Sequence, residues 1–296
     1  MSRTLTAAVR FSAWAAQPTE RQRLDEGALL VAEIARPDLD HRPAIRLLDT
    51  FAAEVWESLG SDTRLLRPEQ TSRRRAAIRL IEAMNDVLVG RHNFHGATDD
   101  YTNPRNSFID VALERRVGLP ITLASIYLEV ARRLGAPLEG VGLPAHFMAR
   151  WPLPAAEGGP IYVDAFHGGC MLEDAEMRHF ILTLIKAPAR NRFEPAWLRA
   201  LNTRQIVTRI LLNLKGAYFE LGDTAMLLEV VDRLTALRPD LPQELRDRGL
   251  LRLALGEPLL AAADIAAYLN RAPEAPENNR LRRRIASAPE VRAKLN

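Results

Sequence analysis

One helix constrains the fold of this chain more than any other feature. The segment ITLASIYLEVARRLGAP (121–137) is apolar around most of its circumference until Arg132 and Arg133, and Gly135 ends it. A helix of this kind is usually buried on all sides. Pro120 suits its first turn, because an N–H at that position would have no intrahelical partner. The fold must therefore surround this helix with other elements.

Two short segments that favour β-structure follow, HFMARW (146–151) and IYVDAF (161–166), separated by the turn-like PLPAAEGGP. We expect them to form a β-hairpin. Pairing His146 opposite Asp164 gives the hairpin one apolar face and one mixed face, because side chains alternate along a strand. The mixed face then also carries Met148, Arg150 and Tyr162.

The N-terminal third shows helical periodicity over residues 24–92, with segments that end at Pro37, Gly60 and Gly90. Between this region and the apolar helix, Ser107 and Asp110 form an S-x-x-D pattern that predicts the cap of a short helix.

The C-terminal third contains a repeat with a period of 34 residues. Leu221-Gly222-Asp223 recurs as Leu255-Gly256-Glu257, and the prolines at 239 and 242 recur at 273 and 276. This period is that of tetratricopeptide helix pairs. The basic segment NNRLRRRIA (278–286) predicts a helix that caps them. We therefore expect an N-terminal helical region (1–92), a central core (93–200) and helical repeats (201–296).

The composition of the chain bears on its binding partners and its location in the cell. Only three of the 40 basic residues are lysines, the 37 acidic residues are interspersed with them, and the net charge is +3. This balance argues against a nucleic-acid surface. Arg10 interrupts the apolar run that a signal peptide would need, and no apolar window is long enough to predict a membrane span. A single cysteine, Cys170, fits the reducing cytoplasm.

The helix start and the hairpin together suggest a type of chemistry. A helix N-terminus lowers the pKa of a thiol, a neighbouring histidine accepts its proton, and a carboxylate orients the imidazole. His146 and Asp164 supply the last two parts of such a Cys-His-Asp triad.

The segments GLPITLASIYLEVARRLGAPLEGVGLPAHFMARW and IYVDAFHGG resemble the bacterial SirB-type family, as do DDYTNPRNSFIDVALERRVGLPITL upstream and LRDRGLL downstream. The resemblance covers about residues 20–290 and implies an α+β protein. N-terminal helices would precede a papain- or transglutaminase-like core, in which a central helix packs on a small antiparallel sheet, and tetratricopeptide-like repeats would follow. The family often has glycine before the histidine, where this chain has Ala145.

The resemblance also implies where a nucleophile would lie. Active transglutaminase-like peptidases carry G-x-C at the start of the central helix, and this spacing places Pro120 of Gly118-Leu119-Pro120 at the cysteine position. The implied triad therefore keeps His146 and Asp164 but lacks its thiol. Thr122 and Cys170 remain open as substitutes, although threonines near a helix start and lone cysteines are usually structural.

Metal ligands and a cofactor are not expected. His92, His95, His146 and His167 with Asp99, Asp100 and Asp164 offer zinc-type groups, but their spacing matches no strong zinc motif. We therefore predict no metal site and no cofactor.

We interpret the loop NFHGATDDYTNPRNS (93–107) as mainly structural, with Asn and Ser suited to capping the next helix. Its alternative role is the rim of a binding cleft. The candidate binding residues are Asp100, Tyr101, Asn106, Arg150 and Tyr162.

Two functions follow from these residues. The first is a non-catalytic regulatory protein that binds a protein or peptide partner through the cleft and the repeats, without nucleic acid or membrane. The alternative is a hydrolase or peptidase that uses His146 and Asp164 with water or Cys170. The sequence does not define the oligomeric state.

Overall fold

A computed structural model of the chain describes residues 3–60, 72–184 and 194–288. The chain divides into two compact units. The sheet unit comprises residues 19–32 and 39–210, and the repeat unit comprises residues 1–18, 33–38 and 211–296. The expected α+β class is confirmed. The division into three regions at residues 92 and 200 stays a prediction.

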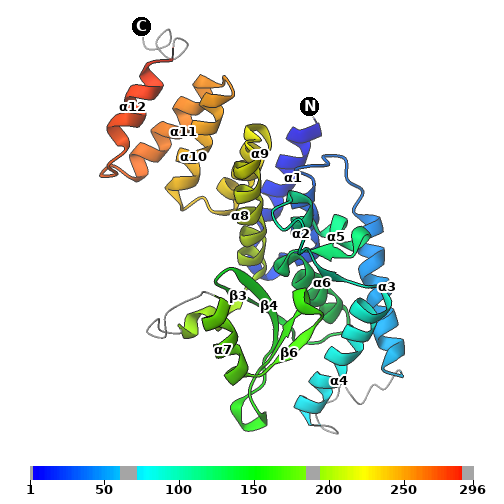
Figure 1. Cartoon of the computed structure of the whole chain (residues 1–296). Helices are drawn as coiled ribbons and strands as arrows, with labels where there is room; N and C mark the ends of the chain where they lie inside the picture. The colour runs from blue at the N-terminus through cyan, green and yellow to red at the C-terminus, as the bar shows by residue number, and fades with distance from the viewer. Residues whose placement is uncertain (1–2, 61–71, 185–193, 289–296) are drawn as a thin grey trace. The chain divides into compact units, whose positions relative to one another are not determined.

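An antiparallel sheet with the strand order β6-β5-β4-β3-β7 forms the centre of the sheet unit (Figure 1). Its strands are β3 (Glu139–Leu143), β4 (His146–Trp151), β5 (Ile161–Asp164), β6 (Cys170–Leu172) and β7 (Ala200–Leu201). A separate parallel pair joins β1 (His95–Gly96) to β2 (Val117–Gly118).

Helix α6 (Pro120–Arg133) is the apolar helix of the sequence, and every residue from Pro120 to Ala131 is buried. It packs against β3 and β4 and contacts several other helices of the unit. The other helices are α2 (Leu24–Ala32), α3 (Arg42–Ser58), α4 (Arg73–Asn85), continued by a π-helix (Asp86–Arg91), and α5 (Ile109–Arg115). The expectation of a central, buried helix on a small sheet is confirmed.

Both faces of the β4–β5 hairpin are buried, which corrects the expected contrast between an apolar and a mixed face. Met148 and Tyr162 belong to an apolar cluster that Met177 and Ile181 complete. These last two residues lie on α7 (Asp174–Leu184), so that helix covers the face of the sheet that was expected to be mixed.

The register of the hairpin also differs from the expected one. Ala149 lies opposite Val163 and Arg150 opposite Tyr162, a shift of two residues from the pairing of His146 with Asp164. A shift of two keeps every side chain on its face. His146 and Asp164 therefore still share a face, but they meet diagonally at the ends of their strands.

Strand β3 has no counterpart in the sequence prediction. Its glycines weaken the β pattern, and their reason is steric: a Cβ on Gly140 would lie 2.7 Å from the Phe147 ring, and one on Gly142 would lie 2.7 Å from Arg209. The expected cap at Ser107 is wrong by one residue. Ser107 ends the 3-10 turn Pro104–Ser107, so Phe108 occupies the N-cap of α5.

An ionic cluster, which we call the arginine cluster, joins α2 to the C-terminal end of α6. Its carboxylates, Asp25 and Glu129, are almost completely buried. Their partners are Arg23, Arg132 and Arg133, with N–O distances of 2.6–3.4 Å. Burial acts to raise the pKa of Asp25, but hydrogen bonds from Arg23 and Arg133 outweigh it and lower this pKa to about 2.

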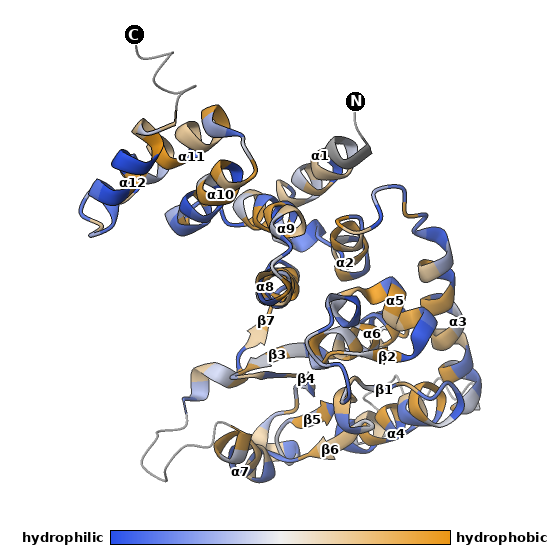
Figure 2. Cartoon of the chain, turned by 45° about the horizontal axis from the view of Figure 1, so that its top comes forward, coloured by the Kyte–Doolittle hydropathy of each residue, from blue (hydrophilic) through white to orange (hydrophobic). Residues whose placement is uncertain are grey.

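The repeat unit contains paired helices with the predicted 34-residue period. Its helices are α1 (Arg3–Ala15), α8 (Thr203–Leu221), α9 (Thr224–Leu237), α10 (Pro242–Ala254), α11 (Pro258–Arg271) and α12 (Asn278–Ala286). Only the part of α8 from residue 211 onward belongs to this unit. Gly222 and Gly256 end equivalent helices with positive φ angles of 69° and 79°. Figure 2 shows that the capping helix α12 is mostly hydrophilic, with Leu281 as its buried apolar anchor.

At one position the two repeats carry chemically different residues, and ion pairs explain the difference. Arg252 stands where the first repeat has Tyr218, and its guanidinium contacts Asp232 of α9 at 3.4 Å and Asp264 of α11 at 2.8 Å. None of the helices in the described ranges is long and apolar enough to cross a membrane.

Candidate functional site

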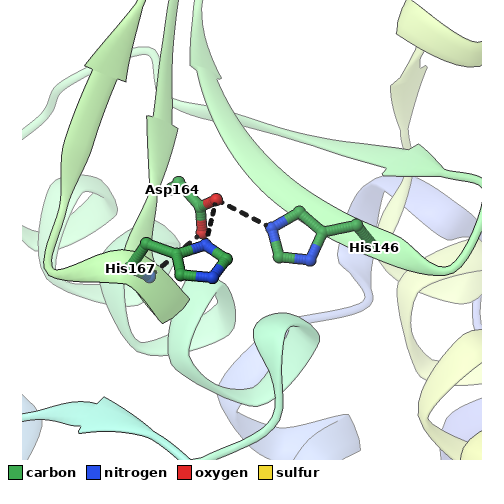
Figure 3. Close-up of side chains that lie close together, drawn as sticks. All are labelled: His146, Asp164 and His167. Carbon is green, nitrogen blue, oxygen red and sulfur yellow. Dashed lines mark hydrogen bonds and ion pairs between the residues drawn. The ribbon is translucent and has the colours of Figure 1, made fainter. Parts of the chain in front are cut away.

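Three side chains meet at one end of the sheet, His146, Asp164 and His167 (Figure 3). Nε2 of His146 lies 2.9 Å from Oδ2 of Asp164, and Nδ1 of His167 lies 2.8 Å from the same oxygen. His146 and Asp164 are buried, whereas the His167 side chain is 59% exposed. We call these three residues the histidine cluster.

A tight turn presents His146. Leu143 pairs with His146 at the ends of β3 and β4, so Pro144 and Ala145 alone connect the strands. Ala145 has a φ of 55°. This conformation favours glycine, because glycine has no Cβ to clash with the backbone. Arg209 fixes the turn by donating to the carbonyl oxygens of Leu143 and His146 at 2.9 and 3.1 Å.

Asp164 holds two groups at once. Its Oδ1 accepts hydrogen bonds from the backbone N–H groups of Phe166 and His167, which caps the 3-10 turn Ala165–His167. Its Oδ2 is thereby directed at the two imidazoles. Burial acts to raise the pKa of Asp164, but hydrogen bonds and charge from His146 and His167 outweigh it, so this pKa lies below its usual value.

Aromatic rings enclose the His146 imidazole. The Phe180 ring lies 5.4 Å from it, and the Phe166 ring packs edge-on at 6.1 Å. Phe166 in turn packs against Gly96, where any Cβ would lie 2.6 Å from the ring. These contacts restrict the orientation of the imidazole.

The start of α6, where the family resemblance places a nucleophile, offers none. Pro120 is the first residue of the helix and is buried. The hydroxyl of Thr122 donates to the carbonyl oxygen of Asn106 at 2.9 Å, and that of Ser125 donates to the carbonyl oxygen of Ile121 at 2.7 Å. Thr122 therefore has a structural role at this position.

Cys170 lies directly opposite Asp164 in the β5–β6 register, and it is exposed. Its Sγ contacts the carbonyl oxygen of Met171 at 3.9 Å. Within the described residues, no hydrogen bond joins this thiol to His146.

The candidate rim residues lie in one loop. Tyr101 is 46% exposed, and its ring packs 6.0 Å from that of Phe166. Asp100 accepts a hydrogen bond from Asn103, and the buried Asn106 donates to the carbonyl oxygen of Asp100. Tyr101 is therefore the rim residue that reaches toward the histidine cluster, while Asp100 and Asn106 shape the loop.

Arg150 and Tyr162 lie further along the strands, away from the histidine cluster. Arg150 pairs with Glu139 and donates to the carbonyl oxygen of Leu198 at 2.7 Å. Tyr162 is buried, which with the nearby Asp174 raises its pKa to about 12. Their contacts are those of structural residues.

From the sequence, we considered His167 only among the possible metal ligands and left it out of the catalytic and binding residues, although it stands three residues after Asp164. The spacing becomes informative only because a 3-10 turn follows Asp164. The other histidines considered as metal ligands lie elsewhere. His92 pairs with Glu54 at 2.6 Å, and His95 contacts the carbonyl oxygen of Asn93.

Asn85 is a second residue near the histidine cluster that the sequence analysis did not identify. Its amide nitrogen donates to the carbonyl oxygen of Gly169 at 2.8 Å, and its amide oxygen accepts from the hydroxyl of Tyr127 at 2.8 Å. Burial raises the pKa of Tyr127, so this hydroxyl keeps its proton. Asn85 therefore links α4 and α6 to the turn that carries His167, and the π-helix that begins at Asp86 is the kind of distortion often found near functional sites.

Residues 43–212 match the transglutaminase-like superfamily, and residues 214–286 match the tetratricopeptide repeat. A UPF0162 protein of Xylella fastidiosa is 35% identical over 249 residues, which is 83% of each chain. Protein SirB1 of Salmonella typhimurium is 25% identical over 88% of this chain and 91% of its own length.

Human F-box only protein 21 is 28% identical over 83% of this chain, a region that makes up 41% of the human protein. No solved structure matches the chain. The extent of the two domain matches and of the bacterial similarities confirms the resemblance seen in the sequence. The chain belongs to the transglutaminase-like superfamily, and within it to the SirB-type proteins that carry C-terminal tetratricopeptide repeats.

Proposed function

We propose that this chain is a non-catalytic transglutaminase-like protein that binds a protein or peptide partner in a regulatory role in the cytoplasm. One observation carries the proposal: Pro120, which has no nucleophile, begins α6 at the position that the family resemblance gives to cysteine. Loss of a triad nucleophile costs several orders of magnitude in rate. A core that keeps its fold without that group is suited to binding.

The repeat unit supports a protein partner, because tetratricopeptide repeats build extended binding surfaces. Phe219 and Leu221, at the end of α8, are 74% and 64% exposed. Leu255, Leu259 and Leu260 are exposed at the equivalent turn between α10 and α11. Exposed aromatic and aliphatic side chains of this kind often mark protein-binding surfaces.

Affinity capture with the full-length chain tests partner binding. We expect a partner that is retained by the wild type and lost from the double variant Phe219→Ser, Leu221→Ser. Val9→Ser, which alters an exposed apolar residue on α1, is the matched control and should retain it. The captured partner is then purified and its affinity for the three proteins measured. Equal affinity for all three would contradict a role for this surface.

A second function, a hydrolase or peptidase, is favoured by the intact hydrogen bond between His146 and Asp164. In that case His146 would activate water or the Cys170 thiol. Amide hydrolysis is therefore measured for the wild type, His146→Ala and Cys170→Ser. We expect no turnover above that of the buffer. Turnover that disappears in His146→Ala would overturn the non-catalytic proposal, and its loss in Cys170→Ser would identify the nucleophile.

A further inference from the structure

The histidine cluster brings three potential metal-ligand atoms close together. Nε2 of His146, Oδ2 of Asp164 and Nδ1 of His167 all lie within 4.8 Å of one another. Both imidazole nitrogens face the same carboxylate oxygen rather than separate partners (Figure 3). We propose that these three atoms bind one divalent transition-metal ion of the zinc class.

The distances require little adjustment. Zinc binds nitrogen and carboxylate oxygen at about 2.0–2.2 Å, so neighbouring ligand atoms of a tetrahedral site lie roughly 3.4 Å apart. The present separations from Oδ2 are 2.9 and 2.8 Å. Side-chain rotations that widen these two gaps by about half an ångström would make room for the ion. The third separation, between Nε2 of His146 and Nδ1 of His167, is within 4.8 Å. Each imidazole then carries its proton on its other nitrogen, Nδ1 in His146 and Nε2 in His167.

The ligands are held in place before any ion binds. Backbone N–H groups of Phe166 and His167 hold Oδ1 of Asp164, which leaves Oδ2 for the ion. Aromatic rings restrict His146, and Asn85 fixes the turn after His167 through the carbonyl oxygen of Gly169. Such outer contacts orient ligands and raise affinity in metal sites.

Charge also favours a cation here. In the described part of the chain, the ion pairs of Asp164 are with the two imidazoles alone. Arg209, behind His146, donates to backbone carbonyl oxygens instead. A buried carboxylate that keeps its negative charge in a medium of low polarity is costly unless a cation compensates it.

The ligand set selects the class of metal. Imidazole nitrogen suits zinc and its neighbours in the periodic table, whereas magnesium and calcium prefer oxygen ligands throughout. Three protein ligands leave a fourth position open. His167 is 59% exposed, so the ion enters from its side of the cluster.

The test is metal binding by the full-length chain without a polyhistidine tag. The protein is stripped with a chelator and titrated with Zn²⁺ against a chromophoric chelator, and Co²⁺ loading reports the coordination number through its visible spectrum. We expect one tightly bound ion per chain and a four-coordinate cobalt spectrum. The readout requires neither a partner nor turnover, so it is independent of the proposed function.

Variants assign the ligands. His167→Ala should weaken binding by more than the roughly 10–100-fold that loss of an outer contact typically costs. Because His167 is exposed, this variant should fold even if Asp164→Asn does not. His179→Ala, on the exposed surface of α7, is the control and should bind like the wild type. No tight ion in the wild type, or equal binding by His167→Ala, would overturn the proposal.

Discussion

The sheet unit contains two buried carboxylate clusters with different partners. In the arginine cluster, Asp25 and Glu129 pair with guanidinium groups that stay charged at every relevant pH. In the histidine cluster, Asp164 pairs with imidazoles, the side chains that ordinarily gain and lose protons near neutral pH. Partners that are always charged suit ion pairs that hold two helices together. Imidazole partners suit a site that binds a ligand or carries out a reaction.

The backbone that carries the two clusters also differs, because one cluster lies mainly on helices and the other on turns. Asp25, Glu129 and Arg133 project from helices α2 and α6. The histidine cluster lies on turns, and Ala145 beside it is a non-glycine residue with a positive φ angle. Strain of this kind persists where the surrounding structure holds it, often at functional sites. The contrast therefore separates a cluster that maintains the fold from one that is positioned by it.

Arg133→Ala should have the largest effect on stability. Its guanidinium, 10% exposed, pairs with Asp25 and Glu129, and its loss leaves two buried carboxylates with fewer partners. Breaking a buried ion pair costs about 3–5 kcal/mol in the free energy of unfolding. Urea unfolding measures the loss. Arg178→Ala, at an exposed pair with Asp174, should cost less than about 1 kcal/mol. Similar losses in both variants would remove the contrast between buried and surface pairs.

Gly169→Ala tests how the turn of the histidine cluster is held. A Cβ on Gly169 would lie 2.0 Å from Oδ1 of Asn85, whereas one on Gly168 would meet nothing within 4 Å. Both glycines have positive φ angles, so each substitution carries about 1–2 kcal/mol of backbone strain. Displacement of Asn85 should add about 1–3 kcal/mol in Gly169→Ala. Equal unfolding free energies for Gly168→Ala and Gly169→Ala would show that Asn85 does not hold the turn.

Acid should weaken the arginine cluster in a defined range. The pKa of Asp25 is about 2 in the folded chain against an ordinary value of 3.8, so its stabilisation is present above about pH 4. It is lost as the pH falls from about 4 to 2, and the shift corresponds to about 2 kcal/mol. Unfolding free energies between about pH 5 and 2.5 should therefore fall less steeply in Asp25→Asn than in the wild type. Parallel curves would contradict the lowered pKa.

The sequence predicted the parts of the fold that depend on local pattern. Apolar residues around the whole of α6 predicted its burial, and the 34-residue period predicted the repeats. Alternation along strands placed His146 and Asp164 on one face despite a register error of two residues, because that error preserves the face.

The missing parts depend on contacts between distant residues. Asp25 and Arg133 are 108 positions apart, so only the packing of α2 on α6 reveals their pairing. The glycines of β3 obscured a strand whose need for glycine comes from Phe147 and Arg209. His167 joins the site through a 3-10 turn that Asp164 itself caps.

Ala145→Gly should have the smallest effect, and in the opposite direction. Ala145 has a φ of 55° in the turn before His146, a backbone conformation that favours glycine. Relief of left-handed strain is worth about 1–2 kcal/mol, and the extra freedom of glycine in the unfolded chain offsets about 0.5–1 kcal/mol of it. Urea unfolding should show a gain of about 0.5 kcal/mol. The carboxylates of the arginine cluster lie on helices, where no comparable gain is available. A lower free energy of unfolding in Ala145→Gly would therefore mean that the turn is not strained and that the backbones of the two clusters do not differ in this way.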